Sequence, residues 1–355
     1  MNPMTLFPQA DTLTAHWGWF QFFLILTFPV HLLAMNALLG TTFAAFVAHF
    51  MPGQKYKLLA FNLGKVLPFL VAFTVNFGVA PLLFVNVLYG QAFYSSSVLM
   101  GIFWLSVIPL IIIAYYAAYL YDFSFKDLGD SGRYLLLLML VVLAIVGFIF
   151  TNNMSLMLTP GSWSRWFTQA SGTLLNLADP TLWPRYLHMI TGGLAIGGLF
   201  VALYATVAVS YERQVVEVGI TYGIRIFTWM TALQVLVGTW YLLSLPPAIK
   251  ALFMGGDALA TGLMVSGIML SLVVLVTGYM QRVITTVLLI VPLVYVMTGI
   301  RDIVRTSTLA PFMSIATTPS VSELSPLILF LVTLVAGVVV IIWMLQQVAR
   351  VSKAR

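Results

Sequence analysis

The chain contains four histidines, which are its most versatile side chains for proton transfer and metal ligation. His31 and His188 lie within long apolar runs, whereas His16 and His49 lie at the ends of such runs. A neutral imidazole surrounded by lipid needs a partner, so His31 and His188 are predicted to be functional. For His16 and His49, a position at the membrane surface is the simpler interpretation.

The residues around His188 read RYLHMITGGLAIGGLF. Gly192 and Ala195 follow one and two helical turns later and share the helix face of the histidine. A face of small residues would admit a flat porphyrin whose iron His188 ligates. The same small residues are also typical of close contact between two membrane helices. Spacing alone does not separate these two interpretations.

A heme b needs one or two axial ligands from His or Met and an apolar slot between helices. Because the chain has no cysteine, a heme would be attached non-covalently. Met264 and Met269 lie in one apolar run and are candidates for a thioether ligand, although most of the 17 methionines must serve packing.

The composition indicates which elements position these side chains. Of the 355 residues, 61% are hydrophobic and only 7% are charged, which suits a lipid bilayer rather than water. A spanning helix needs about 20 apolar residues. The sequence therefore predicts a single all-α transmembrane domain over residues 1–355 with about nine helices. The predicted spans are 18–49, 58–90, 98–121, 133–152, 184–210, 224–245, 259–280, 283–300 and 324–347.

The distribution of Lys and Arg between the loops predicts the orientation, because cytoplasmic loops carry an excess of both. With the N-terminus outside, eleven basic residues lie on the inner side: Lys55, Lys57, Lys65, Lys126, Arg133, Arg213, Arg225, Arg282, Arg350, Lys353 and Arg355. Five lie on the outer side: Arg165, Arg185, Lys250, Arg301 and Arg305. The N-terminus is therefore predicted outside and the C-terminus inside. The net charge of +6 resides in short loops and does not indicate nucleic-acid binding.

The longest predicted loop covers residues 153–183 on the outer side. It contains Trp163, Trp166 and Trp183 and an amphipathic stretch near 163–175. Aromatic residues in such a position are expected at the level of the lipid headgroups.

By the predicted limits, every acidic residue lies in a loop or at a helix end. A charge at the centre of a spanning helix costs roughly 2.5–3.5 kcal/mol, and proteins that keep one usually use it. The absence of such a carboxylate weighs against proton pumping and against reactions that need many protons at a buried site. The ten acids are Asp11, Asp122, Asp127, Asp130, Asp179, Glu212, Glu217, Asp257, Asp302 and Glu323.

Four blocks of the sequence, among them the one around His188, resemble subunit I of cytochrome bd quinol oxidase. FQFFLILTFPVHLLAMNALLGTTF is similar to the family's opening helix, with His31 at the heme-ligand histidine and Leu39–Gly40 in register after it. TNNMSLMLTPGSW places Asn152 at a matching Asn, and PRYLHMITGGLAIGGLF places His188 at the ligand of the low-spin heme b. GLMVSGIML is similar to the block with that heme's methionine ligand, which would be Met264.

The chain also departs from the family pattern. The third span, WLSVIPLIIIAYYAAYLY, has no glutamate where the oxidases carry theirs for proton delivery and the active site. Thr298 stands near the place of a heme-ligating glutamate, and Gly262 stands where the family has an arginine. The quinol-binding loop is reduced to LPPAIKALFMGGD, in which Lys250 and Asp257 correspond weakly to the family's Lys and Glu.

The resemblance implies a heme b-containing membrane subunit of a respiratory complex in a bacterial or archaeal cytoplasmic membrane. It would transfer electrons between menaquinone or ubiquinone and an outer-side partner, such as a c-type cytochrome, without reducing oxygen. His188 and Met264 would ligate one heme iron, and His31, with His16, would serve a second heme. No residue is assigned a catalytic role, and Lys250 and Asp257 are the candidates for quinone binding.

Two alternatives stay open at this point. The first is a diverged bd-type quinol:oxygen oxidoreductase, against which the missing glutamates speak. The second is a heme-free transporter or membrane anchor, in which intramembrane asparagines line a polar path, although interhelical hydrogen bonds explain such residues more simply. These asparagines are Asn36, Asn62, Asn76, Asn86 and Asn153, and the aromatic residues that could flank a quinone are Phe167, Trp183 and Tyr186.

Overall fold

The computed structural model describes residues 3–207, 213–321 and 323–353. Within these residues, nine helices are long and apolar enough to cross a membrane, which confirms the predicted all-α membrane fold. They are α2 (Trp17–Ala48), α4 (Leu67–Leu99), α5 (Gly101–Phe123), α7 (Gly132–Leu158), α8 (Leu182–Val207), α9 (Arg213–Ser244), α11 (Ala258–Tyr279), α12 (Val283–Leu309) and α13 (Leu324–Lys353). Residues 208–210 of the predicted fifth span, Glu212 and Arg355 lie outside the described residues.

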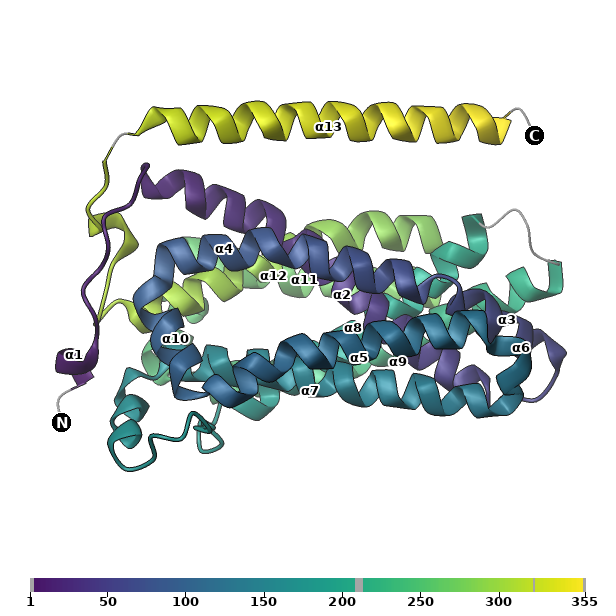
Figure 1. Cartoon of the computed structure of the whole chain (residues 1–355), viewed down its shortest axis with the longest axis horizontal. Helices are drawn as coiled ribbons and strands as arrows, with labels where there is room; N and C mark the ends of the chain where they lie inside the picture. Colours follow the sequence, from purple (N-terminus) through teal and green to yellow (C-terminus); the bar gives the residue numbers. More distant parts are fainter. Residues whose placement is uncertain (1–2, 208–212, 322, 354–355) are drawn as a thin grey trace.

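Short helices connect the spanning helices. They are α1 (Pro3–Leu6), α3 (Gln54–Gly64), α6 (Phe125–Leu128) and α10 (Pro247–Ala251), with a 3-10 helix at Pro160–Phe167 and single helical turns at Gly129–Ser131, Leu252–Gly256 and Ile315–Thr317. The N- and C-termini lie at opposite ends of the long axis (Figure 1), as an odd number of crossings requires. We call the end of the bundle near the N-terminus the outer end, in accordance with the orientation that the charges predict.

Helix α2 is the centre of the bundle and packs against α4, α7, α8 and α12, while α8 pairs with α9, α5 with α7, and α11 with α12. Glycines bring α2 and α8 together: a β-carbon on Gly197 would lie only 2.2 Å from Cα of Gly40. A second close approach joins α8 and α9, where a β-carbon on Gly223 would lie 2.5 Å from the carbonyl oxygen of Gly198. Because lipid supplies no hydrophobic drive between helices, such close backbone packing is a main source of association.

Helix α13 lies apart from the other spanning helices, along one edge of the molecule (Figure 1). Its spanning window has no buried residue. The Phe330 ring contacts the rings of Phe23 and Phe84, with centroids 5.0 Å and 6.5 Å apart. Backbone hydrogen bonds hold the connection that leads into α13 at the outer end. The amide of Leu13 donates to the carbonyl of Pro319, and the amide of Val321 donates to the carbonyl of Leu13, each at 2.8 Å.

The structure corrects the limits of three predicted spans. The sixth was predicted to begin at residue 224, but α9 begins at Arg213. The second predicted span begins as the separate helix α3, and α4 continues to Leu99. The eighth predicted span ended at residue 300, but α12 continues to Leu309. The prediction that every acid lies in a loop or at a helix end is therefore wrong for Asp302. This carboxylate lies about two turns inside α12, where an ion pair with Arg305 offsets the cost of its burial.

The outer loop is packed against the bundle rather than spread along the headgroups. Trp163 is only 4% exposed, its ring stacks on Phe7, and its indole N–H donates to the carbonyl of Leu156 at 2.8 Å. The prediction of an interfacial position is thus wrong for Trp163. Burial of the indole is possible because the N–H has found an acceptor inside the protein.

Candidate functional site

His31 lies in the middle of α2 and faces α4. Its Nδ1 atom lies 3.0 Å from the backbone carbonyl oxygen of Thr74. Because a carbonyl oxygen only accepts hydrogen bonds, Nδ1 carries the proton, and the lone pair on Nε2 stays free. Gly78 lies against the ring, since a β-carbon there would be 2.8 Å from Cε1 of His31. A histidine whose second nitrogen donates to a backbone carbonyl is the usual arrangement of a metal ligand.

His188 lies near the outer end of α8 and faces α9. A β-carbon on Gly238 would be 3.0 Å from Cε1 of the imidazole, so a side chain at this position would press on the ring. The ring of Tyr241 lies on the same side, with centroids 6.2 Å apart. Nδ1 of His188 is buried and has no hydrogen-bond partner within the described part of the chain. A buried polar atom without a partner is rare in native proteins and indicates a place where a further group binds.

Met264 lies on α11 and belongs to the hydrophobic cluster that also contains Tyr241, Phe253 and Val304. Tyr241 thus contacts the ring of His188 and the cluster around Met264. Helices α9 and α12 pack against both α8 and α11, so they bound the space between the two predicted ligands. Met269 differs, because its side chain is 58% exposed on the lipid-facing side of α11. The structure therefore favours Met264 over Met269 as the partner of His188.

The small residues that follow His188 contact neighbouring helices. A β-carbon on Gly192 would lie 3.0 Å from the side-chain amide of Gln234 on α9. Ala195 is 4% exposed and packs in the cluster that contains Phe227 and Leu293. Helix contact accounts for this face of α8, whereas a porphyrin slot along Gly192 and Ala195 stays a prediction.

Two turns of α12 carry a buried charged cluster that was not predicted. Arg305 is 3% exposed, forms an ion pair with Asp302, and lies over the ring of Tyr89 with its guanidinium carbon 4.4 Å from the centroid. The amide nitrogen of Gln21 donates to Asp302 at 2.5 Å. Nε and Nη1 of Arg305 have no hydrogen-bond partner among the described residues. The carboxylate of Asp302 thus pairs with only one of the three nitrogens of this guanidinium, Nη2.

Two further arginines extend the cluster. The guanidinium carbon of Arg301 lies 4.2 Å above the ring of Phe28. Nε of Arg185 donates to the hydroxyl of Tyr241 at 3.1 Å and Nη2 donates to Thr181 at 3.0 Å, while Nη1 is buried without a partner within the described structure. Tyr241 therefore contacts both the imidazole of His188 and the guanidinium of Arg185.

The cluster carries an excess of positive charge, because one carboxylate faces three arginines. A cavity of about 10 Å³ lies beside it, lined by Leu24, Ile25, Phe28, Thr298, Arg301, Asp302 and Arg305. That volume is close to the minimum for one water molecule. The unpartnered guanidinium N–H groups are therefore suited to donate hydrogen bonds to an oxygen of an anionic group. The spacing Arg-Asp-x-x-Arg, at the end of an apolar run, was the sequence signal for this cluster.

The other two histidines, His16 and His49, lie at the two ends of α2. Nδ1 of His16 accepts the amide of Gly18 at 3.1 Å and caps α2. Because His16 and His31 are separated by about 22 Å along α2, they cannot ligate one iron. His49 follows α2, and its Nε2 lies 2.8 Å from the hydroxyl of Tyr121. Burial lowers the pKa of His49 below its ordinary value; Arg133 and Lys57 lower it further, whereas Asp130 opposes this.

The predicted quinone-binding residues have structural roles in this chain. The ammonium of Lys250 donates to the carbonyl of Leu243 at 3.1 Å, and Asp257 caps α11 by accepting the amide of Ala260 at 2.8 Å. Phe167 is 64% exposed and Trp183 is 45% exposed, in keeping with a position beside lipid. Quinone binding at these positions stays a prediction.

The intramembrane asparagines mostly bond within the protein. Asn76 and Asn86 donate to carbonyls one turn earlier in α4, and Asn153 donates to the hydroxyl of Ser97 at 3.1 Å. Asn152 accepts the amide of Asn176 at 2.8 Å and so holds the outer loop. Of these bonds, the one between Asn153 and Ser97 joins two spanning helices, whereas those of Asn76 and Asn86 lie within α4, so the interhelical interpretation is supported for Asn153.

Within the described residues, no group of three or more His, Cys, Asp or Glu side chains is placed to hold a metal ion. A heme iron has a different requirement, since the protein supplies at most two axial ligands. No family model matches the chain, and no curated protein matches its sequence.

Proposed function

We propose that the chain is a heme b-binding membrane subunit of a respiratory complex in a bacterial or archaeal cytoplasmic membrane. In this function it transfers electrons between menaquinone or ubiquinone and a redox partner on the outer side, such as a c-type cytochrome, and does not reduce oxygen. The resemblance to subunit I of cytochrome bd quinol oxidase is part of the same proposal.

The observation that carries the proposal is the hydrogen bond between His31 and Thr74. It holds the ring with Nε2 free in the interior of a lipid-embedded bundle, as heme ligation requires. His188 adds a second imidazole with an unpartnered nitrogen, and Met264 packs against the same hydrophobic cluster as Tyr241, which contacts His188. These donors fit a heme b, which would supply one-electron transfer when bound.

The charged cluster on α12 also supports heme binding, because its arginines offer hydrogen-bond donors. The edge of a heme carries two carboxylates, and the free guanidinium atoms of Arg305 and Arg185 are donors that match them. The proteins that reduce oxygen also need a proton path. Helix α5 has Asp122 near its inner end but no glutamate in its interior, and the hydroxyl of Thr298 donates to the carbonyl of Val294 in its own helix. Electron transfer without oxygen chemistry is therefore the function that these residues support best.

Heme content of the purified protein tests the proposal. A pyridine hemochrome assay should detect b-type heme in the wild type, a lower content in His188→Ala, and a lower content in His31→Ala. His49→Gln is the matched control and should keep the wild-type heme content. Absence of b-type heme from the wild type would remove the proposal. Unchanged heme content in both His188→Ala and His31→Ala would show that neither imidazole ligates the heme.

A further inference from the structure

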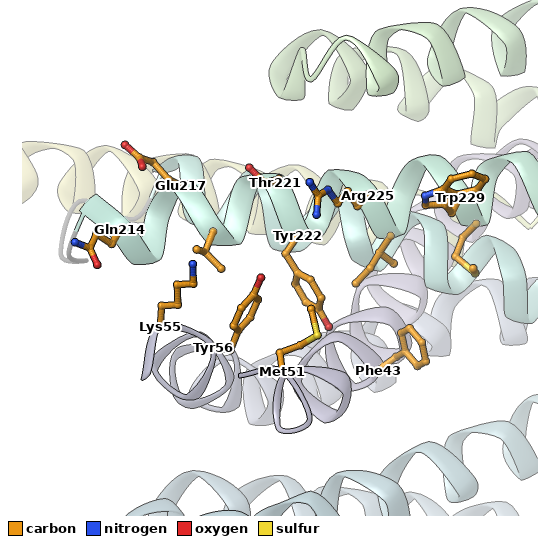
Figure 2. A pocket seen from close by; sticks show the side chains of 13 residues that line it. Phe43, Met51, Lys55, Tyr56, Gln214, Glu217, Thr221, Tyr222, Arg225 and Trp229 are labelled. Atoms are coloured by element: carbon orange, nitrogen blue, oxygen red, sulfur yellow. The ribbon is translucent and has the colours of Figure 1, made fainter. Parts of the chain in front are cut away.

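A pocket of about 640 Å³ opens near the inner end of the bundle, between α9 on one side and α2 and α3 on the other. Figure 2 shows Lys55 and Tyr56 of α3, and Met51 of the turn before it, reaching toward α9, with Tyr222 pointing back between them. Phe43, Arg225 and Trp229 line the remainder. The pocket is remote from the histidines: Gly238, which faces His188, is about 20 Å further along α9 than Arg225.

The length of α9 sets the depth of this pocket in the membrane. The helix has 32 residues, whereas about 20 residues cross the hydrocarbon core. Counted from the outer end at Ser244, the core ends near Arg225. Arg225 therefore lies at the level of the inner headgroups, and Trp229, which is 72% exposed, lies one turn deeper in the usual belt position.

The rim of the pocket has an excess of positive charge. Glu217 is the acidic residue in the lining, and its carboxylate is already paired with Nε of Arg213 at 3.2 Å. Neither Lys55 nor Arg225 forms an ion pair within the described residues. Lys57, on the other face of α3, is instead paired with Asp130 at 3.0 Å. Two cations are therefore available to an anionic ligand.

The deeper part of the pocket is apolar. Phe43, Ile226, Trp229 and Met230 line it, and the hydroxyl of Tyr222 is occupied because it donates to the carbonyl of Ala44 at 2.9 Å. Such a pocket has cations at headgroup level and an apolar wall below them. This order of charge and depth matches a phospholipid of the inner leaflet that has an anionic headgroup.

We propose that this pocket binds one anionic phospholipid, with the phosphate between Lys55 and Arg225 and an acyl chain along Phe43 and Trp229. A basic residue near a membrane surface contributes about 1 kcal/mol to the attraction of anionic lipid. Loss of both cations should therefore weaken binding of this lipid roughly 30-fold.

The test uses the full chain, purified in detergent, delipidated, and titrated with phosphatidylglycerol or phosphatidylcholine under native mass spectrometry. The wild type should retain one phosphatidylglycerol in preference to phosphatidylcholine, and added salt should weaken the preference. Lys55→Gln with Arg225→Gln should lose it. Lys126→Gln with Arg282→Gln is the matched control, because it removes two exposed inner-side cations outside the pocket.

A variant that should bind the lipid more tightly complements the double variant, because misfolding can cause a loss of lipid binding but not a gain. Glu217→Gln removes the carboxylate from the rim and frees Arg213, so it should bind phosphatidylglycerol roughly threefold more tightly. Equal affinity for the two lipids, equal losses in both double variants, or retention of a quinone in place of the lipid would each overturn the proposal.

Discussion

The hydroxyl oxygen of Tyr241 accepts a hydrogen bond of 3.1 Å from Nε of Arg185. The same tyrosine ring lies beside His188, so one phenol connects a candidate heme ligand to a partly buried cation. Tyr241→Phe keeps the ring but leaves Nε without its acceptor, which should cost about 1–3 kcal/mol of stability. Thermal unfolding in detergent measures this loss, and the reduction potential of bound heme should shift in the same variant.

Tyr279→Phe is the control for this change, because Tyr279 is 80% exposed. Equal unfolding temperatures for the two variants would show that the bond to Arg185 contributes nothing.

Met264 and Met269 lie on the same helix, yet only the first packs against Tyr241 and its cluster. Leucine has nearly the volume of methionine but cannot ligate iron. Met264→Leu should therefore convert a low-spin heme spectrum to a high-spin one, whereas Met269→Leu should leave the spectrum unchanged. Optical spectra of the reduced proteins decide between these outcomes, and two identical low-spin spectra would exclude Met264 as the axial ligand.

The ion pair between Arg305 and Asp302 is buried, with side-chain exposures of 4% and 15%. Removal of one partner leaves the other charge unpaired in the bundle, so Arg305→Gln should destabilise the protein by about 3–5 kcal/mol. Combining it with Asp302→Asn should recover part of that loss, because the carboxylate that lost its guanidinium partner is then removed as well. A double-mutant cycle of unfolding free energies measures the coupling, and strictly additive losses would contradict it.

The glycine contact between α2 and α8 predicts a position-dependent effect of an added methyl group. Gly197→Ala places a β-carbon 2.2 Å from Cα of Gly40, so the backbones must separate, at a cost of about 1–3 kcal/mol. Gly262→Ala meets no atom within 4 Å and should stabilise α11 by about 0.5–1 kcal/mol. Thermal unfolding of the two variants should shift in opposite directions, and a neutral Gly197→Ala would count against the close crossing.

His49 should make stability depend on pH. Burial holds its pKa in the folded state below the ordinary value of 6.5. Its stabilising contribution is therefore complete above about pH 6.5 and is lost as the pH falls toward the folded pKa, because the unfolded chain then binds the proton more readily. His49→Gln should flatten the unfolding temperature between pH 7.5 and pH 5. The same slope in wild type and variant would assign the dependence to other groups.

The sequence predicted the number and type of the spanning elements because runs of apolar residues are a direct signal for helices in lipid. It failed at the end of α12, because Arg301, Asp302 and Arg305 read as a polar loop by hydropathy. In the structure these charges are partly compensated by an ion pair within α12, by stacking on rings of other helices and by a bond from Gln21. The rings and Gln21 lie far away in the chain, so the Arg-Asp-x-x-Arg spacing alone did not show that these charges are buried.

The candidate site was predictable in part for the same reason. His31 and His188 stood out as polar residues in apolar runs. Their partners Thr74, Gly238 and Tyr241 were not identifiable, because a backbone carbonyl, a glycine and an aromatic ring are common in any membrane helix. The inner pocket was also missed, since it forms only where α3 meets α9.

The hydrogen bonds between Leu13 and residues 319–321 have a consequence for how the protein is made. Leu13 leaves the ribosome long before its partners, and domains fold from the N-terminus as synthesis proceeds. This contact between the N-terminal segment and the connection to the ninth spanning helix therefore forms only after the other eight spanning helices have been translated.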